Sequence, residues 1–296
     1  AFTRERIEGY TAALHPAVAR ELDTWHARSG FPAYPALKAL TLNLATQIFM
    51  GGHRIADPAQ LDRVNRAFIA CVQAAGAIDI SGATITADAI TGHKDVTLAG
   101  ATTIDRQILG GGDVNISGPS IKAGTIVSGV DFLGTAAANG NIVQTTSGDV
   151  SLTSSGNITV GTLLSADDLS AAGSTISADG VTAHGDVSLD GATNVSGQIL
   201  GARNVLITGQ SLSAQTVVGG IDFDATNAAS GNIVLGQAGD LTVSVNGAVA
   251  ASTLQAAGAI DVKAGNISAN TISGHKNIAL SGTTAVDGQI LGANDV

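Results

Sequence analysis

The sequence predicts a mainly β fold, a right-handed parallel β-helix preceded by a short all-α segment. Two observations lead to this prediction: an apolar-x-apolar-x-Gly pattern recurs at intervals of about 18 residues, and a longer segment recurs at intervals of 91. Aromatic residues make up only 3% of the 296 residues and 38 are Gly, so the core has to be built from small aliphatic side chains. This composition is typical of a repetitive fold with a narrow interior.

The first part of the chain carries a helical pattern. Apolar residues recur at spacings of three and four over residues 3–25, 37–48 and 61–72, which places them on one face of a helix each time. Glycine, proline or an N-capping aspartate separates these runs. We therefore expect an all-helical domain over residues 1–72 and a β-helix repeat domain over residues 73–296.

Residues 31–51, which begin Phe-Pro-Ala-Tyr-Pro, and residues 62–72 resemble helices in the first half of a bacterial cytochrome P-450. The resemblance implies haem binding and oxygen activation by a cysteine-ligated haem monooxygenase. The family holds its thiolate in a Phe-x-x-Gly-x-x-x-Cys-x-Gly loop, whereas Cys71 lies in a helical stripe without that loop and is interpreted as a small core residue. The family's Glu-x-x-Arg pair and its oxygen-activating helix motif are also absent.

We therefore expect no catalytic, cofactor-binding or metal-binding residues in this chain, and no enzymatic activity. Haem would bind only if the missing parts of a monooxygenase were present.

The rest of the chain is a long repeat. Residues 90–100, 181–191 and 272–282 align without gaps, each 91 residues after the last. Four steps of about 18 residues and a fifth that is one residue longer make up this period, and apolar alternation broken by Gly, Asn and Asp predicts short strands joined by tight turns. Such coils stack in parallel, and the handedness of parallel crossovers favours a right-handed coil. Dividing the 222 residues of 75–296 by this step gives about twelve coils.

Residues 148–159 and 256–269 resemble the haemagglutinin repeats of filamentous haemagglutinin and related two-partner-secreted bacterial exoproteins. This resemblance covers residues 75–296 and implies a structural or adhesive shaft in a secreted or surface protein. Its partner would be a host-surface glycan or protein. The location would be extracellular or at the cell surface if the repeat decides it, and cytoplasmic if residues 1–72 do. No signal peptide is visible at the start.

The charge distribution excludes some partners. Before residue 75 there are eight Lys or Arg against six Asp or Glu, and after it six against eighteen, which together give the net charge of −10. An acidic rod repels phosphate, so we expect no nucleic-acid binding.

No apolar run approaches eighteen residues, so we expect no membrane span. The open strand edges of a stacked coil predict self-association.

Three recurring histidines, His93, His184 and His275, raise the question of a metal site. Positions 91 residues apart would be five coils and about 24 Å apart, too far to share one ion, so we interpret them as turn residues kept by duplication. The run 110–114 is faintly similar to calcium-binding nonapeptide repeats, but it lacks their tandem nine-residue spacing and predicts a turn before a strand.

The acidic residues raise the question of a polysaccharide-cleaving site. Asp131 and Asp222 recur beside Phe132 and Phe223, but they belong to different long repeats and few basic residues are near them in the sequence, so we do not expect catalysis. Other acids precede strands, where Asp favours turns through local hydrogen bonds. These turn acids are Asp95, Asp113, Asp149, Asp186 and Asp240.

The two parts join at a short shared string. Residues 72–80 match residues 254–262, and the match stops abruptly upstream. The expectation is a chimera, natural or arising from sequence assembly, in which a catalytically incomplete helical fragment precedes the shaft. The alternative function is that of a fragment of a cytochrome P-450-type monooxygenase whose active site is missing from this chain.

Overall fold

The chain divides into two compact units, Ala1–Ala75 and Gly76–Val296. In this computed structural model the described part of the first unit is Val18 and Ala19, which are helical. The other residues of the predicted helical segment, Cys71 among them, lie outside the described residues. The structure describes residues 18–19, 77–132, 142, 144–224 and 233–295.

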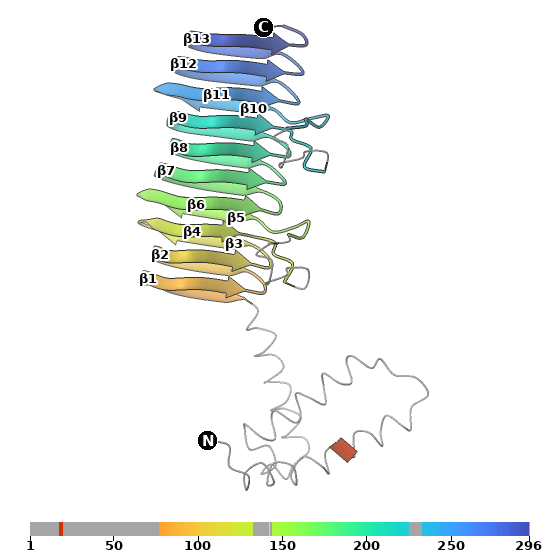
Figure 1. The fold of residues 1–296 in the computed structure, drawn as a ribbon. Helices are drawn as coiled ribbons and strands as arrows, with labels where there is room; N and C mark the ends of the chain where they lie inside the picture. Colours follow the sequence, from red (N-terminus) through yellow and green to blue (C-terminus); the bar gives the residue numbers. More distant parts are fainter. Residues whose placement is uncertain (1–17, 20–76, 133–141, 143, 225–232, 296) are drawn as a thin grey trace. The chain divides into compact units, whose positions relative to one another are not determined.

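The second unit is a single sheet of thirteen parallel strands wound into a coil (Figure 1). The sheet confirms the predicted parallel β-helix, and in Figure 1 the front strands run from left to right as the coil rises from β1 to β13, the right-handed sense. The strands are β1 Ile78–Gly92, β2 Val96–Gly110, β3 Val114–Gly118, β4 Ile121–Val127, β5 Val150–Ser154, β6 Asn157–Ser165, β7 Leu169–Ala183, β8 Val187–Gly201, β9 Val205–Gly219, β10 Leu241–Val245, β11 Ala248–Ala256, β12 Ile260–Gly274 and β13 Ile278–Gly292.

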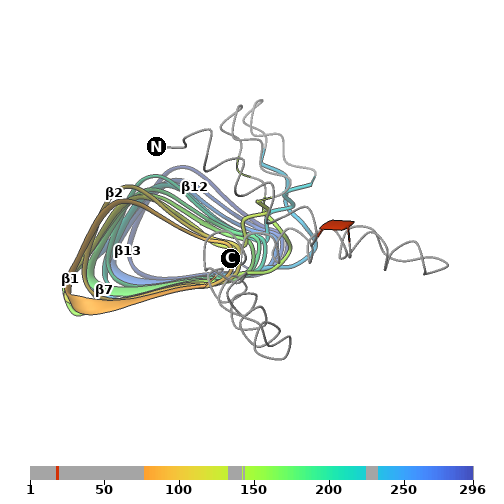
Figure 2. The ribbon, with the colours of Figure 1, turned by 90° about the horizontal axis from the view of Figure 1, so that it is seen from below.

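Most coils consist of one bent strand. Seen along the axis, the coils superpose on one closed outline (Figure 2). Two shifts in the register of β1 and β2, after Ser81 and after Ala87, mark the bends that divide a coil into three legs. Because pairing resumes beyond each bend, seven of the strands reach 15 residues, and the prediction of several short strands in every coil is wrong for them.

The core is a set of columns in which equivalent aliphatic residues stack from coil to coil. Burying each Val, Leu or Ile side chain stabilises the fold by about 1.5–3 kcal/mol, so the repeated apolar positions fix the register. All but the first residue of the column at the start of the first leg are buried. This column consists of Ile78, Val96, Val114, Val150, Leu169, Val187, Val205, Leu241, Ile260 and Ile278.

The glycine of the apolar-x-apolar-x-Gly pattern lies at the bend after the first leg. Gly191 is an example, with a φ of 152°. A Cβ atom at Gly191 would lie 2.1 Å from the carbonyl oxygen of Gly173 in the coil below. Close stacking of neighbouring coils therefore requires glycine at this bend, which explains why the pattern ends on glycine.

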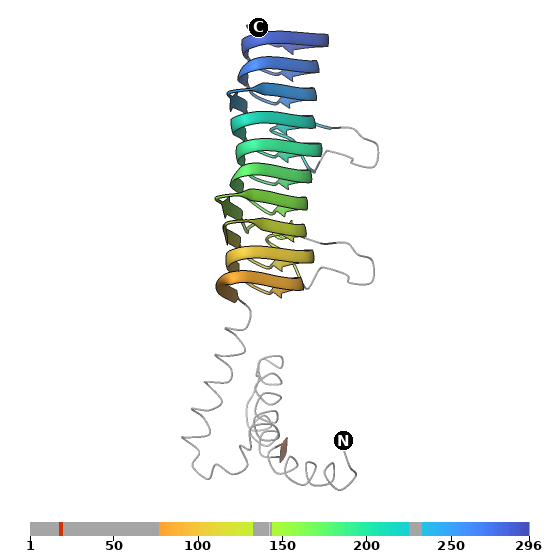
Figure 3. The ribbon, with the colours of Figure 1, turned by 90° about the vertical axis from the view of Figure 1, so that its left-hand side faces the viewer.

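The coil count differs from the sequence prediction. Val114 pairs with Val150, and Val205 pairs with Leu241, so neighbouring coils begin 36 residues apart at these two places, twice the usual step. The described ends of the two additional segments lie on the same side of the stack (Figure 3). We call these segments the first excursion (130–147) and the second excursion (221–238).

Each 91-residue period therefore holds four coils and one excursion. The column at the start of the first leg has ten residues instead of the expected twelve. An excursion has the length of a coil, so counting the period cannot distinguish the two.

Candidate functional site

The most regular polar feature of the rod is a column of six aspartates and one asparagine, which we call the acidic ladder. Each member precedes the first leg of its coil, and its side-chain oxygen accepts a hydrogen bond from the backbone N–H of the equivalent residue in the next coil. The seven distances lie between 2.7 and 3.0 Å. The members are Asp95, Asp113, Asp149, Asp168, Asp186, Asn204 and Asp240.

The five turn acids predicted from the sequence are all members of this ladder. Their hydrogen bonds run between coils, however, and are not the local bonds that we expected. Sequence reasoning missed Asp168 and Asn204, although both directly precede an apolar-x-apolar pair at the regular step of the repeat. That position relative to the apolar pattern is the signal that would have found them.

Like charges crowd one stretch of the ladder. Partial desolvation raises the pKa of Asp149 above its ordinary value, the hydrogen bond from the Asp168 N–H opposes this shift, and the charges of Asp113 and Asp168 add to it. Arg203 lies beside the ladder, 2.8 Å from Asp167 and 2.5 Å from Asp168. The hydrogen bond to Asp168 is the main reason why the pKa of Arg203 is raised.

Two of the recurring histidines contact the excursions. The rings of His93 and Phe132 stack with centroids 4.4 Å apart and planes 9° apart. The rings of His184 and Phe223, at the equivalent positions, are 4.6 Å apart and tilted by 31°. A Cβ atom at Gly111 would be 3.3 Å from the Phe132 ring, and the residue 91 positions later is Ala202.

The base of the first excursion is polar. The buried hydroxyls of Ser128 and Ser165 are 3.0 Å apart. The Ser128 hydroxyl donates to the Gly148 carbonyl at 2.7 Å, and the Ser165 hydroxyl donates to the Asp168 carbonyl at 2.7 Å and lies 3.0 Å from that of Gly148. The Gln144 amide donates to the Ser128 carbonyl at 2.9 Å, beside an antiparallel bridge between Val130 and Gln144.

The base of the second excursion follows the same path with apolar residues. An antiparallel bridge joins Ile221 and Leu235. The positions equivalent to Ser128 and Ser165 are Gly219 and Ala256.

The structure separates the residues that a metal or catalytic site would have to bring together. Equivalent positions 91 residues apart are four coils apart, about 19 Å at about 4.8 Å per coil, and not the five coils expected from the sequence. Asp131 and Asp222 therefore lie beyond the separation at which two carboxyl groups cleave a glycosidic bond. Among the residues that the structure describes, no group of three or more His, Cys, Asp or Glu side chains could hold a metal ion.

The described part of the chain contains no helix with the length and apolar character needed to cross a membrane.

Comparison with known proteins identifies relatives for a minor part of the chain. A stretch of 80 residues, 26% of this chain, is 38% identical to proteins named "Putative cytochrome P450 136" from two strains of Mycobacterium tuberculosis, CDC 1551 / Oshkosh and ATCC 25618 / H37Rv. The match spans 16% of the length of these relatives. No family model and no solved structure matches the chain. The similarity to a cytochrome P-450 is thus partial, and the resemblance to haemagglutinin repeats stays a prediction.

Proposed function

We propose that the coil of residues 77–295 is the structural or adhesive shaft of a bacterial surface or secreted exoprotein. The observation that carries the proposal is the continuous stack of columns, which makes a long rod (Figure 3). Rigid repeats of this kind present extended surfaces to partners, and loops held by a rigid scaffold are common binding elements. Its partner would be a host-surface glycan or protein.

Adhesion can be tested directly with the whole chain. Beads coated with the chain should remain on a monolayer of epithelial cells under flow that removes beads coated with serum albumin. Soluble chain added in excess should release them. Equal retention of both kinds of bead would contradict the adhesive function.

Self-association of the rod is part of this proposal. In the described residues β1 pairs only with β2, and β13 only with β12, so each has one edge without a neighbour in the sheet. Apolar side chains are exposed on both strands: Ile80 by 38%, Ile290 by 37% and Leu291 by 52%. We expect light scattering from the purified chain to show oligomers that dissociate on dilution. A single monomer peak at high concentration would contradict this expectation.

The second candidate function is that of a haem monooxygenase fragment, and the partial similarity to a putative cytochrome P450 is the observation in its favour. Haem titrated into the chain would then give a Soret band, and carbon monoxide would give the difference band typical of thiolate-ligated haem. We expect neither, because the ligand loop of that family is absent from the sequence. A thiolate-type difference band would reverse the preference between the two functions.

A further inference from the structure

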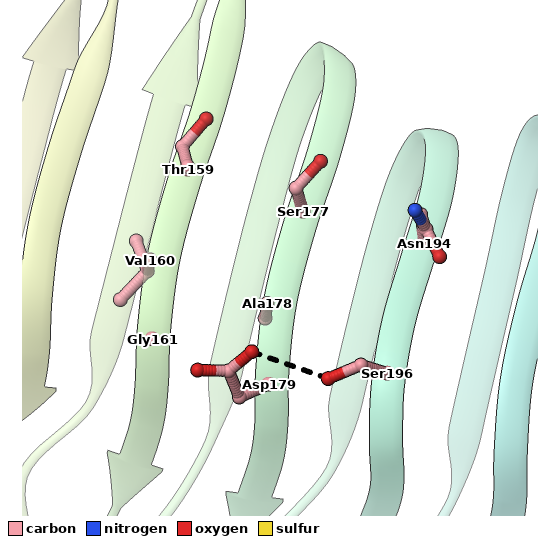
Figure 4. A pocket seen from close by; sticks show the side chains of 8 residues that line it. All are labelled: Thr159, Val160, Gly161, Ser177, Ala178, Asp179, Asn194 and Ser196. Atoms are coloured by element: carbon pink, nitrogen blue, oxygen red, sulfur yellow. Dashed lines mark hydrogen bonds between the residues drawn. The ribbon is translucent and has the colours of Figure 1, made fainter.

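A polar groove crosses the outer surface of β6, β7 and β8 at their second bend (Figure 4). One wall is a row of side chains on neighbouring strands, Thr159, Ser177 and Asn194, which point to the same side. On the other wall the Ser196 hydroxyl donates to the Asp179 carboxylate at 3.1 Å. The groove has a volume of about 290 Å³, at the lower end of the range for small-molecule sites.

The groove exists because the bend is built differently in neighbouring coils. In β6 and β7 the bend has the same number of unpaired residues, which in β6 is Gly161 alone. Where β7 pairs with β8, the bend of β8 contains one unpaired residue more than that of β7. The extra residue is a bulge that brings Ser196 to Asp179. Gly161 lines the groove beside Asp179, and close stacking on the coil below requires glycine there, since a Cβ atom would lie 2.4 Å from the carbonyl oxygen of Gly124.

The positions 91 residues later keep the bulge but not the lining. β13 also has one residue more than β12 at this bend. Ala250 and Ala285 replace Thr159 and Asn194, so the row of hydrogen-bonding groups is lost, and Ser252 replaces Gly161. The polar lining is therefore not repeated at the equivalent place in the next period.

The lining defines the chemistry of a ligand. Hydroxyl and amide groups both donate and accept hydrogen bonds, as do the hydroxyls of a sugar, while the Asp179 carboxylate only accepts and repels anions. The groove lies on the face of the sheet, where the strands are already paired, so a peptide could not add to it as a further strand.

We propose that this groove binds a neutral oligosaccharide. The proposal rests on the adhesive function and assigns a place on the rod to its glycan partner. The lining contains no aromatic ring on which a sugar could stack, so hydrogen bonds provide the affinity and a single site binds at about millimolar Kd. Self-associated rods would present many such sites and gain avidity.

The test uses the whole chain, labelled with ¹⁵N, and four neutral probes: maltohexaose, cellohexaose, mannohexaose and N-acetylated chitohexaose. An oligogalacturonate hexamer is the anionic probe. We expect at least one neutral probe to shift the amide signals of Ser177, Asp179 and Asn194 at millimolar concentration, and the anionic probe to bind about tenfold more weakly.

Ser177→Phe fills the groove, and Ser268→Phe, 91 residues later on the same face, is the matched control. Ser177→Phe should weaken binding by about tenfold or more, while Ser268→Phe should leave it within about twofold. Equal melting temperatures of the two variants show that neither substitution acts through the fold. Asp179→Asn should improve binding of the anionic probe.

Three results would overturn the proposal: no shift of the groove amides by any neutral probe, an equal loss in both Phe variants, or a preference for the anionic probe. The adhesive function is judged separately. If the Ser177→Phe chain holds beads on cells as well as the unmodified chain does, adhesion uses another surface and only the groove proposal fails. If neither chain holds beads while the oligosaccharide still binds, only the adhesive function fails.

Discussion

The two excursions leave the rod by the same backbone path but over differently built bases. Beneath the first, the hydroxyls of Ser128 and Ser165 and the amide of Gln144 hydrogen-bond to the backbone. Beneath the second, the equivalent residues are Gly219, Ala256 and Leu235. Backbone hydrogen bonds such as Val130 N to Gly110 O and Ile221 N to Gly201 O, 2.9 and 3.0 Å long, are common to both.

This difference indicates that the path is set by the backbone and its glycines, whereas the side chains beneath set how strongly it is held. Both excursions begin at a glycine with a left-handed backbone, Gly129 with a φ of 64° and Gly220 with a φ of 78°. Substitution of a residue that both bases share should therefore lower the free energy of unfolding more than replacement of a residue that differs between them.

The largest effect is expected at the shared glycines. A Cβ atom at Gly129 would lie 2.3 Å from the Cβ of Ala166, and one at Gly220 would lie 2.4 Å from the carbonyl oxygen of Ala238. Gly129→Ala and Gly220→Ala should each lower the free energy of unfolding by about 2–4 kcal/mol, measured by urea denaturation. The control is Gly180→Ala, where the nearest atom to an added Cβ is 4.0 Å away. Equal stability of Gly129→Ala and Gly180→Ala would disprove the role of the backbone.

The next effect concerns the polar base alone. Ser165→Ala removes the hydroxyl that donates to the Asp168 carbonyl at 2.7 Å and lies 3.0 Å from the Gly148 carbonyl and the Ser128 hydroxyl, and it should cost about 1–2 kcal/mol. The double variant Ser128→Gly, Ser165→Ala introduces the two small residues of the second base and should cost less than the sum of the two single changes, as a double-mutant cycle would show. The exposed Ser170→Ala serves as the reference and should stay within about 0.5 kcal/mol. Strict additivity would mean that the two hydroxyls act independently.

A third substitution should raise the stability of the fold instead of lowering it. Thr102 and Thr193 occupy equivalent buried positions in the core, but the Thr102 hydroxyl donates to the Gly100 carbonyl at 3.1 Å, whereas the Thr193 hydroxyl has no hydrogen-bond partner among the described residues. Thr193→Val should raise stability by about 1 kcal/mol, and Thr102→Val should not. Thermal melting measured by circular dichroism distinguishes the two, and stabilisation by both to the same extent would contradict this reading.

The smallest effect is electrostatic. The pKa of Asp149 is higher in the folded chain than in the unfolded one, so ionisation of this group disfavours folding, and its penalty appears as pH rises through the unfolded and then the folded pKa. Asp149→Asn keeps a side-chain acceptor, as Asn204 does in the natural ladder, and should add a few tenths of a kcal/mol at pH 7.

The gain from Asp149→Asn should shrink as pH falls through the folded and then the unfolded pKa of this carboxyl, because the wild-type group becomes protonated. Asp240→Asn is the matched control, because its ladder neighbours are Asn204 and Ala259, which carry no charge. A gain at Asp149 that does not change with pH would rule out an electrostatic origin.

Most of the coil could be predicted from the sequence because nearly every inward position has to hold an apolar side chain. Val96, Val114 and Val187 belong to one buried column, and a polar residue in that column would be buried without a partner. The excursions could not be predicted in this way, because a segment that leaves the stack is as long as a segment that forms a coil.

The polar features depend on contacts between coils, which no local pattern describes. His93 and Phe132 are far apart in the sequence and meet only because Phe132, at the start of the first excursion, lies beside the turn of the coil that holds Gly111. The groove likewise depends on one extra residue in the bend of β8, a feature of register and not of composition.

The central claim is that a 91-residue period contains four coils and one excursion, and a long distance within the rod tests it. Thr86 and Ser268 lie on the same outward column, eight coil steps apart. Spin labels on Thr86→Cys and Ser268→Cys, with Cys71 replaced by Ser, should be about 38 Å apart by pulsed electron resonance. A distance of about 48 Å, the value for five coils in each period, would contradict the account.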